Sequence, residues 1–127
     1  MDTAAKFALA DRLFAAVEGG DLEGVRDCYA PELAVWHNFD QKEQTRDESL
    51  QTLAWLCKVI DERRYEITRR EELPDGILQL HILRGRAVKT GAPYALPAAI
   101  VVTMAETADG NRITRLDEYL DPGAAPK

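Results

Sequence analysis

The sequence predicts an α+β domain in which N-terminal helices pack on one side of a strongly curved antiparallel sheet. Up to about residue 60, apolar residues recur mainly every three or four positions, as on one face of a helix. From Arg63 onward apolar and polar residues alternate, as in half-buried strands. Short turn motifs separate these later strands, so strands adjacent in sequence are expected to pair with each other. The 127 residues suffice for one domain with a sizeable core.

Two helices are expected at the N-terminus. Thr3 can cap the first helix, and Gly19-Gly20 ends it. The apolar stripe of this helix is Phe7, Ala10, Leu13, Phe14 and Val17. Asp21 can cap a short second helix, which Pro31 prevents from continuing. The apolar side chains of the second helix are Leu22, Val25, Cys28 and Tyr29.

A strand and a third helix follow. The segment from Leu33 to Asp40 is predicted to be a short strand, and the polar run up to Arg46 is predicted to be a loop. Asp47 or Ser49 can cap the third helix. Its apolar stripe is Leu50, Leu53, Ala54, Cys57 and Ile60, which predicts that it covers the sheet.

Four strands complete the predicted domain. Tyr65 and Ile67 lie on one face of the first of them, and the turn Leu73-Pro74-Asp75-Gly76 leads into a long strand, residues 77–88. Thr90-Gly91 and Asp109-Gly110-Asn111 are the next two turns, and they precede strands over residues 94–105 and 112–120. We therefore expect a single domain over residues 1–121 and a flexible tail over residues 122–127.

Composition excludes several classes of function. The chain has 16 basic and 22 acidic residues and a net charge of -6, which disfavours nucleic acid and anionic membranes as partners. Cys28 and Cys57 show neither disulfide nor metal-ligand spacing. The first residues lack the basic flank and apolar core of a signal peptide, and no run reaches transmembrane length. These features predict a cytoplasmic protein.

Strand parity indicates which polar side chains face the interior. In the first predicted strand the odd row, Leu33 and Val35, is apolar up to His37. We therefore expect His37 to point inward, and Asn38 to do so if the register differs by one residue. A structural histidine at this position is the alternative interpretation of His37.

The last strand contributes a carboxylate. Its more apolar row is the even one, Thr114, Leu116, Glu118 and Leu120. A carboxylate on that row needs a cation or hydrogen-bond donors, and the candidates are His81 and Arg84 on the long strand. Gly85 could mark a bulge that changes which of these two faces inward. Alternatively, Glu118 forms a structural ion pair with Arg84 or Arg86.

A family resemblance rests on four segments, which are Phe14 to Val25, Tyr29-Ala30-Pro31, Trp36-His37-Asn38 and Ile113 to Asp121. Together they resemble the SnoaL-like family of the nuclear transport factor 2-like, or ketosteroid isomerase-like, superfamily. The resemblance implies a conical α+β barrel with an apolar pocket, commonly assembled as a homodimer across the sheet. It does not imply one reaction, since the superfamily contains isomerases, polyketide cyclases, epoxide hydrolases, dehydratases and binding modules.

Comparison with ketosteroid isomerases argues against their reaction in its usual form. Leu13 stands where those enzymes carry the oxyanion-hole tyrosine, and Ala99 stands where they carry a protonated aspartate. A developing enolate would therefore lack both stabilising donors. His37 aligns with their base, and a shift of one residue would place Asn38 there instead.

Comparison with limonene epoxide hydrolases leads to a similar result. Glu118 occupies the position of one catalytic aspartate in those enzymes. Their Arg-x-Asp pair corresponds to His81 and Leu83, so the second carboxylate is absent.

The remaining polar groups suit acid–base chemistry on a small, mostly apolar metabolite, without a cofactor or metal. We expect an isomerase, cyclase or lyase in which His37 is the acid and base, Glu118 with His81 or Arg84 orients it, and Asn38 donates to a substrate oxygen. The residues expected to contact the ligand are Trp36, Asn38, Asp40, Trp55, Arg84 and Tyr94. One alternative is a non-catalytic hydrophobic-ligand-binding or dimerisation module, and another is an epoxide hydrolase with a rearranged site.

Overall fold

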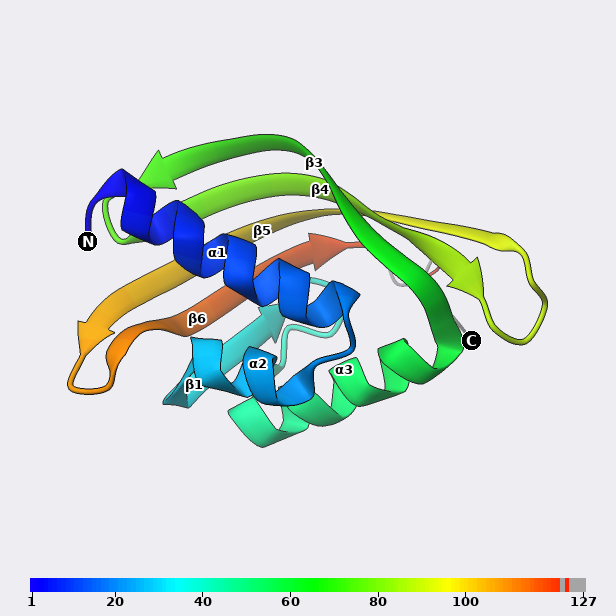
Figure 1. Cartoon of the computed structure of the whole chain (residues 1–127), viewed down its shortest axis with the longest axis horizontal. Helices are drawn as coiled ribbons and strands as arrows, with labels where there is room; N and C mark the ends of the chain where they lie inside the picture. The colour runs from blue at the N-terminus through cyan, green and yellow to red at the C-terminus, as the bar shows by residue number, and fades with distance from the viewer. Residues whose placement is uncertain (122, 124–127) are drawn as a thin grey trace.

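In the computed structural model, which describes residues 1–121 and 123, a curved six-stranded sheet wraps around three helices (Figure 1). The helices lie on the concave side of the sheet, so the predicted α+β class is confirmed. The sheet is not closed into a barrel, because its two edge strands, β2 (Glu43–Gln44) and β3 (Ile60–Leu73), do not pair with each other. Apart from Gly123, the tail expected over residues 122–127 lies outside the described residues.

The first two helices are close to expectation. Helix α1 spans Thr3–Glu18, but its N-cap is Asp2, whose carboxylate accepts from the Ala5 amide at 2.8 Å. Thr3 was predicted to be the cap; instead it is the first helical residue, and its hydroxyl donates to Glu72. Helix α2 spans Leu22–Cys28 and is capped by Asp21 as predicted.

The third helix begins earlier than predicted. Helix α3 spans Arg46–Val59, and its N-cap is Thr45 instead of Asp47 or Ser49. The Thr45 hydroxyl accepts from the Glu48 amide at 3.3 Å, and the Glu48 carboxylate accepts from the Thr45 amide at 3.0 Å. This reciprocal capping box satisfies two donors at once, which explains why the helix begins there.

The strands are β1 (Tyr29–His37), β2 (Glu43–Gln44), β3 (Ile60–Leu73), β4 (Gly76–Ala87), β5 (Pro93–Thr107) and β6 (Gly110–Leu120). Strand β1 therefore includes Tyr29, which was predicted to be helical, and β2 lies in the segment predicted to be a loop. The three predicted turns join β3 to β4, β4 to β5 and β5 to β6, and these pairs are antiparallel.

The position of β1 corrects the expectation of a wholly antiparallel sheet. The strand order is β2-β1-β6-β5-β4-β3, and β1 runs parallel to β6. After β1 and the short edge strand β2, the chain crosses the concave side through α3 and enters the sheet again at the far edge as β3. The meander from β3 to β6 then returns to β1. In this arrangement His37 lies opposite Glu118.

The core lies between α1 and the concave face of the sheet. Leu9, Leu13 and Phe14 of α1 are buried in one cluster with Ile77 and Val102 of the sheet. Helix α3 contacts both β1 and β3, and so spans the gap between the two sides of the curved sheet. Between α3 and the concave face of the sheet lies the cavity described below.

A bulge in β3 explains which side chains of β4 face the interior. Glu62 and Arg63 lie opposite the single residue Gly85, and Glu62 has a φ of 55°. A Cβ at Gly85 would lie 2.7 Å from the Asp61 carbonyl oxygen, so only glycine fits there without a shift. The bulge is therefore in β3, and β4 keeps one inward row, Ile77, Gln79, His81 and Leu83.

Candidate functional site

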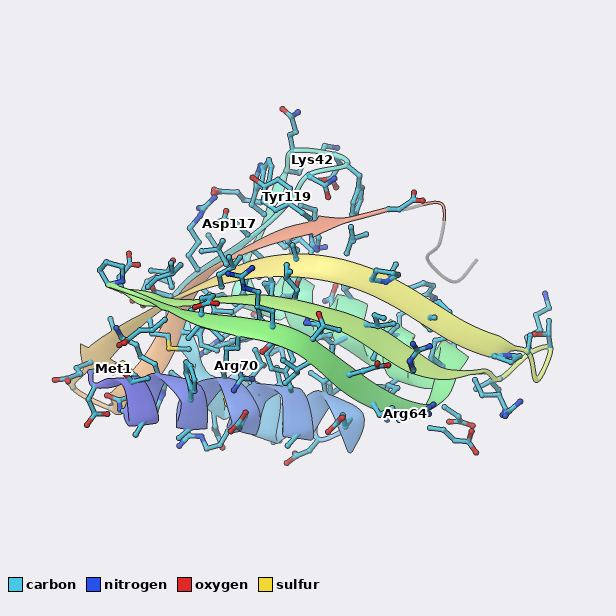
Figure 2. The ribbon with its side chains drawn as sticks, turned by 90° about the horizontal axis from the view of Figure 1, so that it is seen from above. Met1, Lys42, Arg64, Arg70, Asp117 and Tyr119 are labelled. Atoms are coloured by element: carbon cyan, nitrogen blue, oxygen red, sulfur yellow. The ribbon has the colours of Figure 1, made fainter. Side chains whose placement is uncertain are left out.

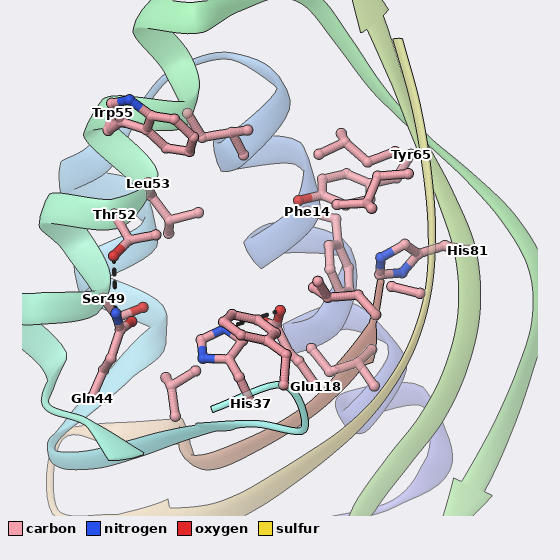
Figure 3. A pocket seen from close by; sticks show the side chains of 18 of the residues that line it. Phe14, His37, Gln44, Ser49, Thr52, Leu53, Trp55, Tyr65, His81 and Glu118 are labelled. Atoms are coloured by element: carbon pink, nitrogen blue, oxygen red, sulfur yellow. Dashed lines mark hydrogen bonds and ion pairs between the residues drawn. The ribbon is translucent and has the colours of Figure 1, made fainter. Parts of the chain in front are cut away.

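A cavity of about 300 Å³ lies between α3 and the concave face of the sheet (Figure 3). Most of its walls are apolar, with contributions from α1, α3 and all six strands. The polar or titratable side chains that line it are His37, Gln44, Ser49, Thr52, Tyr65, His81, Tyr94 and Glu118. A mostly apolar cavity with a few convergent polar groups is the usual form of a small-molecule site.

His37 and Glu118 form the main polar pair of this cavity. They are register partners on the parallel strands β1 and β6, so their side chains leave the sheet on the same face. The His37 Nε2 atom lies 3.6 Å from the Glu118 Oε2 atom, and the two side chains are 13% and 26% exposed. The inward orientation predicted for both residues from strand parity is confirmed.

Asn38 holds this pair in register from outside the cavity. Its side-chain oxygen accepts from the Leu120 amide at 2.9 Å, and its own amide donates to the Glu118 carbonyl at 3.1 Å. The end of β1 is therefore tied to β6 on both sides of Tyr119, directly after Glu118. Asn38 was predicted to contact the ligand, but it does not line the cavity. Its side chain positions the two strands instead.

The Glu118 carboxylate changes the acidity of His37. Its interaction with the imidazole raises the pKa of His37 above 6.5, although partial burial of the ring opposes this effect. Asp40 adds a smaller contribution in the same direction. An imidazole beside a carboxylate that stabilises its protonated form suits a group that takes up and returns a proton.

His81 projects into the same cavity from β4 and is 7% exposed (Figure 3). Its ring packs edge-on against Phe14 and Tyr65, with centroid distances of 5.5 and 4.9 Å. Burial lowers the pKa of His81, and the Arg70 charge acts in the same direction, whereas Glu118 opposes both. The cavity therefore contains two imidazoles whose pKa values are shifted in opposite directions.

Hydroxyl groups supply further donors. Burial raises the pKa of Tyr65 above its usual range, and Figure 3 shows its side chain reaching into the cavity beside Phe14. The Tyr94 hydroxyl is buried, and within the described part of the chain it has no hydrogen-bond partner. Burial raises the pKa of Tyr94 to about 12, so this hydroxyl is also protonated near neutral pH.

Trp55 and Tyr94 line the cavity as predicted, but Trp36, Asp40 and Arg84 do not. Trp36 belongs to the even row of β1, which faces away from the helices, and it packs on Tyr119 at a centroid distance of 5.4 Å. Figure 2 shows Tyr119 on the side of the sheet opposite α1.

Asp40 and Arg84 are used elsewhere. The Asp40 carboxylate accepts from the Lys42 amide at 3.0 Å within an exposed turn. Arg84 forms an ion pair with Glu66 of β3, and it belongs to the row of β4 that faces away from the cavity. Neither Arg84 nor His81 is therefore the ion-pair partner of Glu118, and that partner is His37.

Leu13 and Ala99, the two positions compared with ketosteroid isomerases, do not line the cavity. Leu13 is buried in the core, and its neighbour Phe14 lines the cavity. Ala99 belongs to the outward row of β5, whereas Ala98 and Ile100 line the cavity. None of these five side chains carries a hydrogen-bond donor.

Some cavity residues were not identified from the sequence. Tyr65 was recognised only as a strand residue, although the alternation of Tyr65 and Ile67 with Glu66 and Thr68 marked two faces, of which one must be inward. Gln44 and Thr52 are hydrogen-bonded to each other at 3.1 Å, and nothing in the sequence indicated this pair. Phe39 is 47% exposed and lines the mouth of the cavity.

Among residues 1–121 and 123, no group of three His, Cys, Asp or Glu side chains is arranged to hold a metal ion. Over the same residues the longest helix has 16 residues, and no helix could cross a bilayer.

The family model for the SnoaL-like domain matches residues 10–116. The chain therefore belongs to the SnoaL-like family, and the resemblance inferred from its sequence motifs is confirmed. A comparison with curated proteins finds no significant match.

Solved structures share the fold at low sequence identity. IdmH of Streptomyces antibioticus, a proposed polyketide cyclase, has a TM-score of 0.77 at 16% identity, covering 94% of each chain. A proposed isomerase of Bacillus subtilis has a TM-score of 0.77 at 16% identity, covering 98% of this chain and 92% of its own. AclR of Streptomyces galilaeus, a proposed hydroxylase, has a TM-score of 0.81 at 13% identity, covering 94% of this chain and 91% of its own. These similarities establish the fold.

Proposed function

We propose that this protein is a cofactor-independent acid–base enzyme of the isomerase, cyclase or lyase type, acting on a small and mostly apolar metabolite. The observation that carries the proposal is the pair formed by His37 and Glu118 at 3.6 Å inside a mainly apolar cavity. The names of similar structures, which include proposed cyclases and an isomerase, support this range of reactions.

In the proposed reaction, neutral His37 removes a proton from a carbon next to a carbonyl group. The Glu118 carboxylate stabilises the imidazolium that results, and the imidazolium then returns the proton to the substrate at the same or another atom. The apolar walls exclude water, which strengthens the interaction between the two charges. Asn38 contributes by holding β1 and β6 in the register that aligns the pair.

A probe reaction tests this proposal without knowledge of the natural substrate. 2-Tetralone is a compact apolar ketone with acidic α-hydrogens, and their exchange for deuterium in D₂O is followed by NMR. We expect the protein to accelerate exchange and the His37→Gln variant to lose about 10²- to 10⁴-fold of that acceleration. Glu118→Gln should lose part of it, whereas Glu32→Gln, at an exposed position of β1, is the matched control.

The same experiment distinguishes the second candidate, a non-catalytic binding protein. The exposed aromatic rings of Phe39 and Trp55 at the cavity mouth, 47% and 43% exposed, favour capture of an apolar ligand whether or not chemistry follows. Chemical shift changes at cavity residues on addition of 2-tetralone, with exchange at the rate of buffer alone, would contradict the enzyme proposal and support the binding protein.

We further propose that the protein assembles as a homodimer through the convex face of the sheet. The outward rows of β4 and β5 are apolar along much of their length, with Leu78, Leu80, Ile82, Pro97, Ala99 and Val101. Leu80 and Tyr119 are 36% and 50% exposed on this face. A contiguous apolar surface of this kind is typical of an interface between proteins.

A further inference from the structure

His81 lies at the inner end of a chain of polar side chains that begins at the protein surface. The Asp11 carboxylate of α1 accepts from Arg70 Nη1 at 2.7 Å. Arg70 of β3 donates from Nε and Nη2 to Gln79 Oε1 at 2.9 and 2.7 Å. The Gln79 side-chain nitrogen is 2.8 Å from His81 Nδ1. Gln79 is fully buried, so its hydrogen bonds cannot be exchanged for bonds to solvent.

The donor and acceptor capacities along this chain determine the orientation of each group. A guanidinium group only donates, so the Gln79 atom that faces Arg70 must be the oxygen. The Gln79 nitrogen therefore faces His81, and because an amide nitrogen also only donates, His81 Nδ1 must accept. In neutral imidazole the other ring nitrogen, Nε2, then carries the proton. A second proton on Nδ1 would be directed at the amide N–H group of Gln79.

The Nε2 side of the ring is available to a ligand. His81 lines the cavity, and no hydrogen bond within residues 1–121 and 123 uses its Nε2 atom. Phe14 and Tyr65 pack against the ring and hold its plane. Figure 3 shows the ring projecting into the cavity from the wall opposite α3.

We propose that Arg70 and Gln79 hold His81 as the neutral tautomer with its proton on Nε2, so that His81 donates a hydrogen bond to a carbonyl-type oxygen of the ligand and does not act as a base. His37 and His81 thus have different tasks, since His37 faces a carboxylate that favours its protonation and His81 faces an amide donor. Arg70 and Gln79 are positioning residues in this arrangement, because they act through His81.

The charged and titratable groups around His81 agree with a neutral ring. Arg70 on β3 and burial disfavour the imidazolium, whereas Glu118 on β6 favours it and is not within ion-pair distance. Tyr65 of β3 is protonated and uncharged near neutral pH, because burial raises its pKa. A neutral donor in an apolar cavity can stabilise negative charge that develops on a carbonyl oxygen during proton removal. This ligand assignment rests on the proposed function, whereas the tautomer does not.

The tautomer is tested by two-bond ¹H–¹⁵N correlation spectra of the untagged protein. The chain contains only two histidines, so the His37→Gln variant assigns the signals of His81. We expect a protonated, pyrrole-type Nε2 and a pyridine-type Nδ1, with a titration midpoint below 6.5. A proton on Nδ1, or a midpoint at or above 6.5, would overturn the proposal. This readout is independent of turnover, so it holds even if the enzyme proposal fails.

The Gln79→Glu variant reverses the arrangement, because a carboxylate accepts from both Arg70 and His81. We expect the neutral ring to carry its proton on Nδ1 in this variant and to titrate at higher pH than in the wild type. Gln51→Glu, the same substitution at an exposed position of α3, should leave the His81 spectrum unchanged. An unchanged His81 tautomer in Gln79→Glu would show that Gln79 does not control it. If that variant fails to fold, the tautomer seen in the wild-type spectrum is the deciding test.

Ligand discrimination tests the donor role. 2-Acetylnaphthalene and 2-isopropenylnaphthalene have nearly the same shape, but only the first has an acceptor oxygen. In Gln79→Glu, we expect the affinity for the ketone relative to that for the alkene to fall about fivefold from its wild-type value. The affinities are measured at a pH above the titration of the His81 imidazolium in this variant. An unchanged ratio, or no binding of the ketone by the wild type, would overturn the assignment of the ligand oxygen.

Discussion

The two histidines differ because of the atoms that face each ring. His37 has a carboxylate at 3.6 Å, and this interaction raises its pKa. His81 has an amide nitrogen at 2.8 Å and is more deeply buried, so its pKa is lowered. Two side chains with the same intrinsic pKa are therefore suited to different steps, one to proton transfer and the other to hydrogen-bond donation.

The Glu118→Gln variant should move the pKa of His37 down toward or below 6.5, because the largest cause of its elevation is removed. Asp40→Asn should have a smaller effect, since Asp40 is a minor cause. NMR titration of the His37 ring measures both changes. A His37 pKa that is the same in wild type and Glu118→Gln would contradict the role assigned to the carboxylate.

This interaction also predicts how stability depends on pH. The pKa of His37 is raised in the folded state, so its contribution to the free energy of unfolding is complete below about pH 6.5 and is lost as the pH rises through the folded-state pKa. Urea denaturation on either side of that interval should show a larger loss of stability with rising pH in the wild type than in Glu118→Gln. An equal loss in both proteins would contradict the prediction.

At the scale of elements, Arg63 joins two helices to the bulge of β3. Its guanidinium donates to the carbonyls of Val17 and Glu18 at 3.0 and 3.3 Å, at the end of α1. It also donates to the carbonyls of Cys57 and Ile60 at 3.1 and 2.6 Å, at the end of α3. Carbonyls at helix C-termini lack partners within the helix and carry partial negative charge, so a cation satisfies and stabilises both ends.

Replacing Arg63 with Met should lower the free energy of unfolding by about 2–3 kcal/mol, because partly buried carbonyls lose a charged donor. Arg64→Met is the matched control at the next position, where the side chain is exposed, and it should change stability by at most about 0.5 kcal/mol. Urea denaturation measures both values. Similar losses in the two variants would show that Arg63 is not a specific link between α1 and α3.

At the scale of the whole molecule, one face of the curved sheet packs on the core and the cavity. The other face carries an apolar strip, formed by the outward residues Leu78, Leu80, Ile82, Pro97, Ala99 and Val101. Figure 2 shows the sheet nearly edge-on, with α1 on one side and Asp117 and Tyr119 on the other. This apolar strip lies on β4 and β5. The inward side chains of β5, such as Ile100 and Val102, belong to the core. A partner on the convex face would therefore bury these strands on both faces.

Analytical ultracentrifugation should give twice the chain mass of 14.2 kDa if the proposed homodimer forms through this face. Leu80→Lys should shift the protein toward monomer, because it places a charge on the strip. Val88→Lys is the control, since Val88 is 53% exposed but lies in the turn after β4, away from the strip. A monomeric wild type, or dissociation by both substitutions alike, would contradict the proposed interface.

The sequence by itself determined the α+β class, the three turns of the meander, the family, and the inward orientation of His37 and Glu118. These features depend on local periodicity, on turn residues such as Pro74 and Gly110, and on the alternation of side chains along a strand. The cap of α3 was predictable in principle, since Thr45 and Glu48 have capping-box spacing.

Only the tertiary structure decided which residues meet across strands. Glu118 was expected to orient His37 from strand parity and the family resemblance, but the contact itself comes from the parallel pairing of β1 with β6. No local pattern specifies a pairing between segments so far apart in sequence. The partners of Arg84 and Arg70 are likewise determined by strand pairing. Arg84 of β4 pairs with Glu66 of β3, and Arg70 of β3 donates to Gln79 of β4. Periodicity determines the face on which a side chain lies, but the protonation of His81 depends on the donor that packing places beside it.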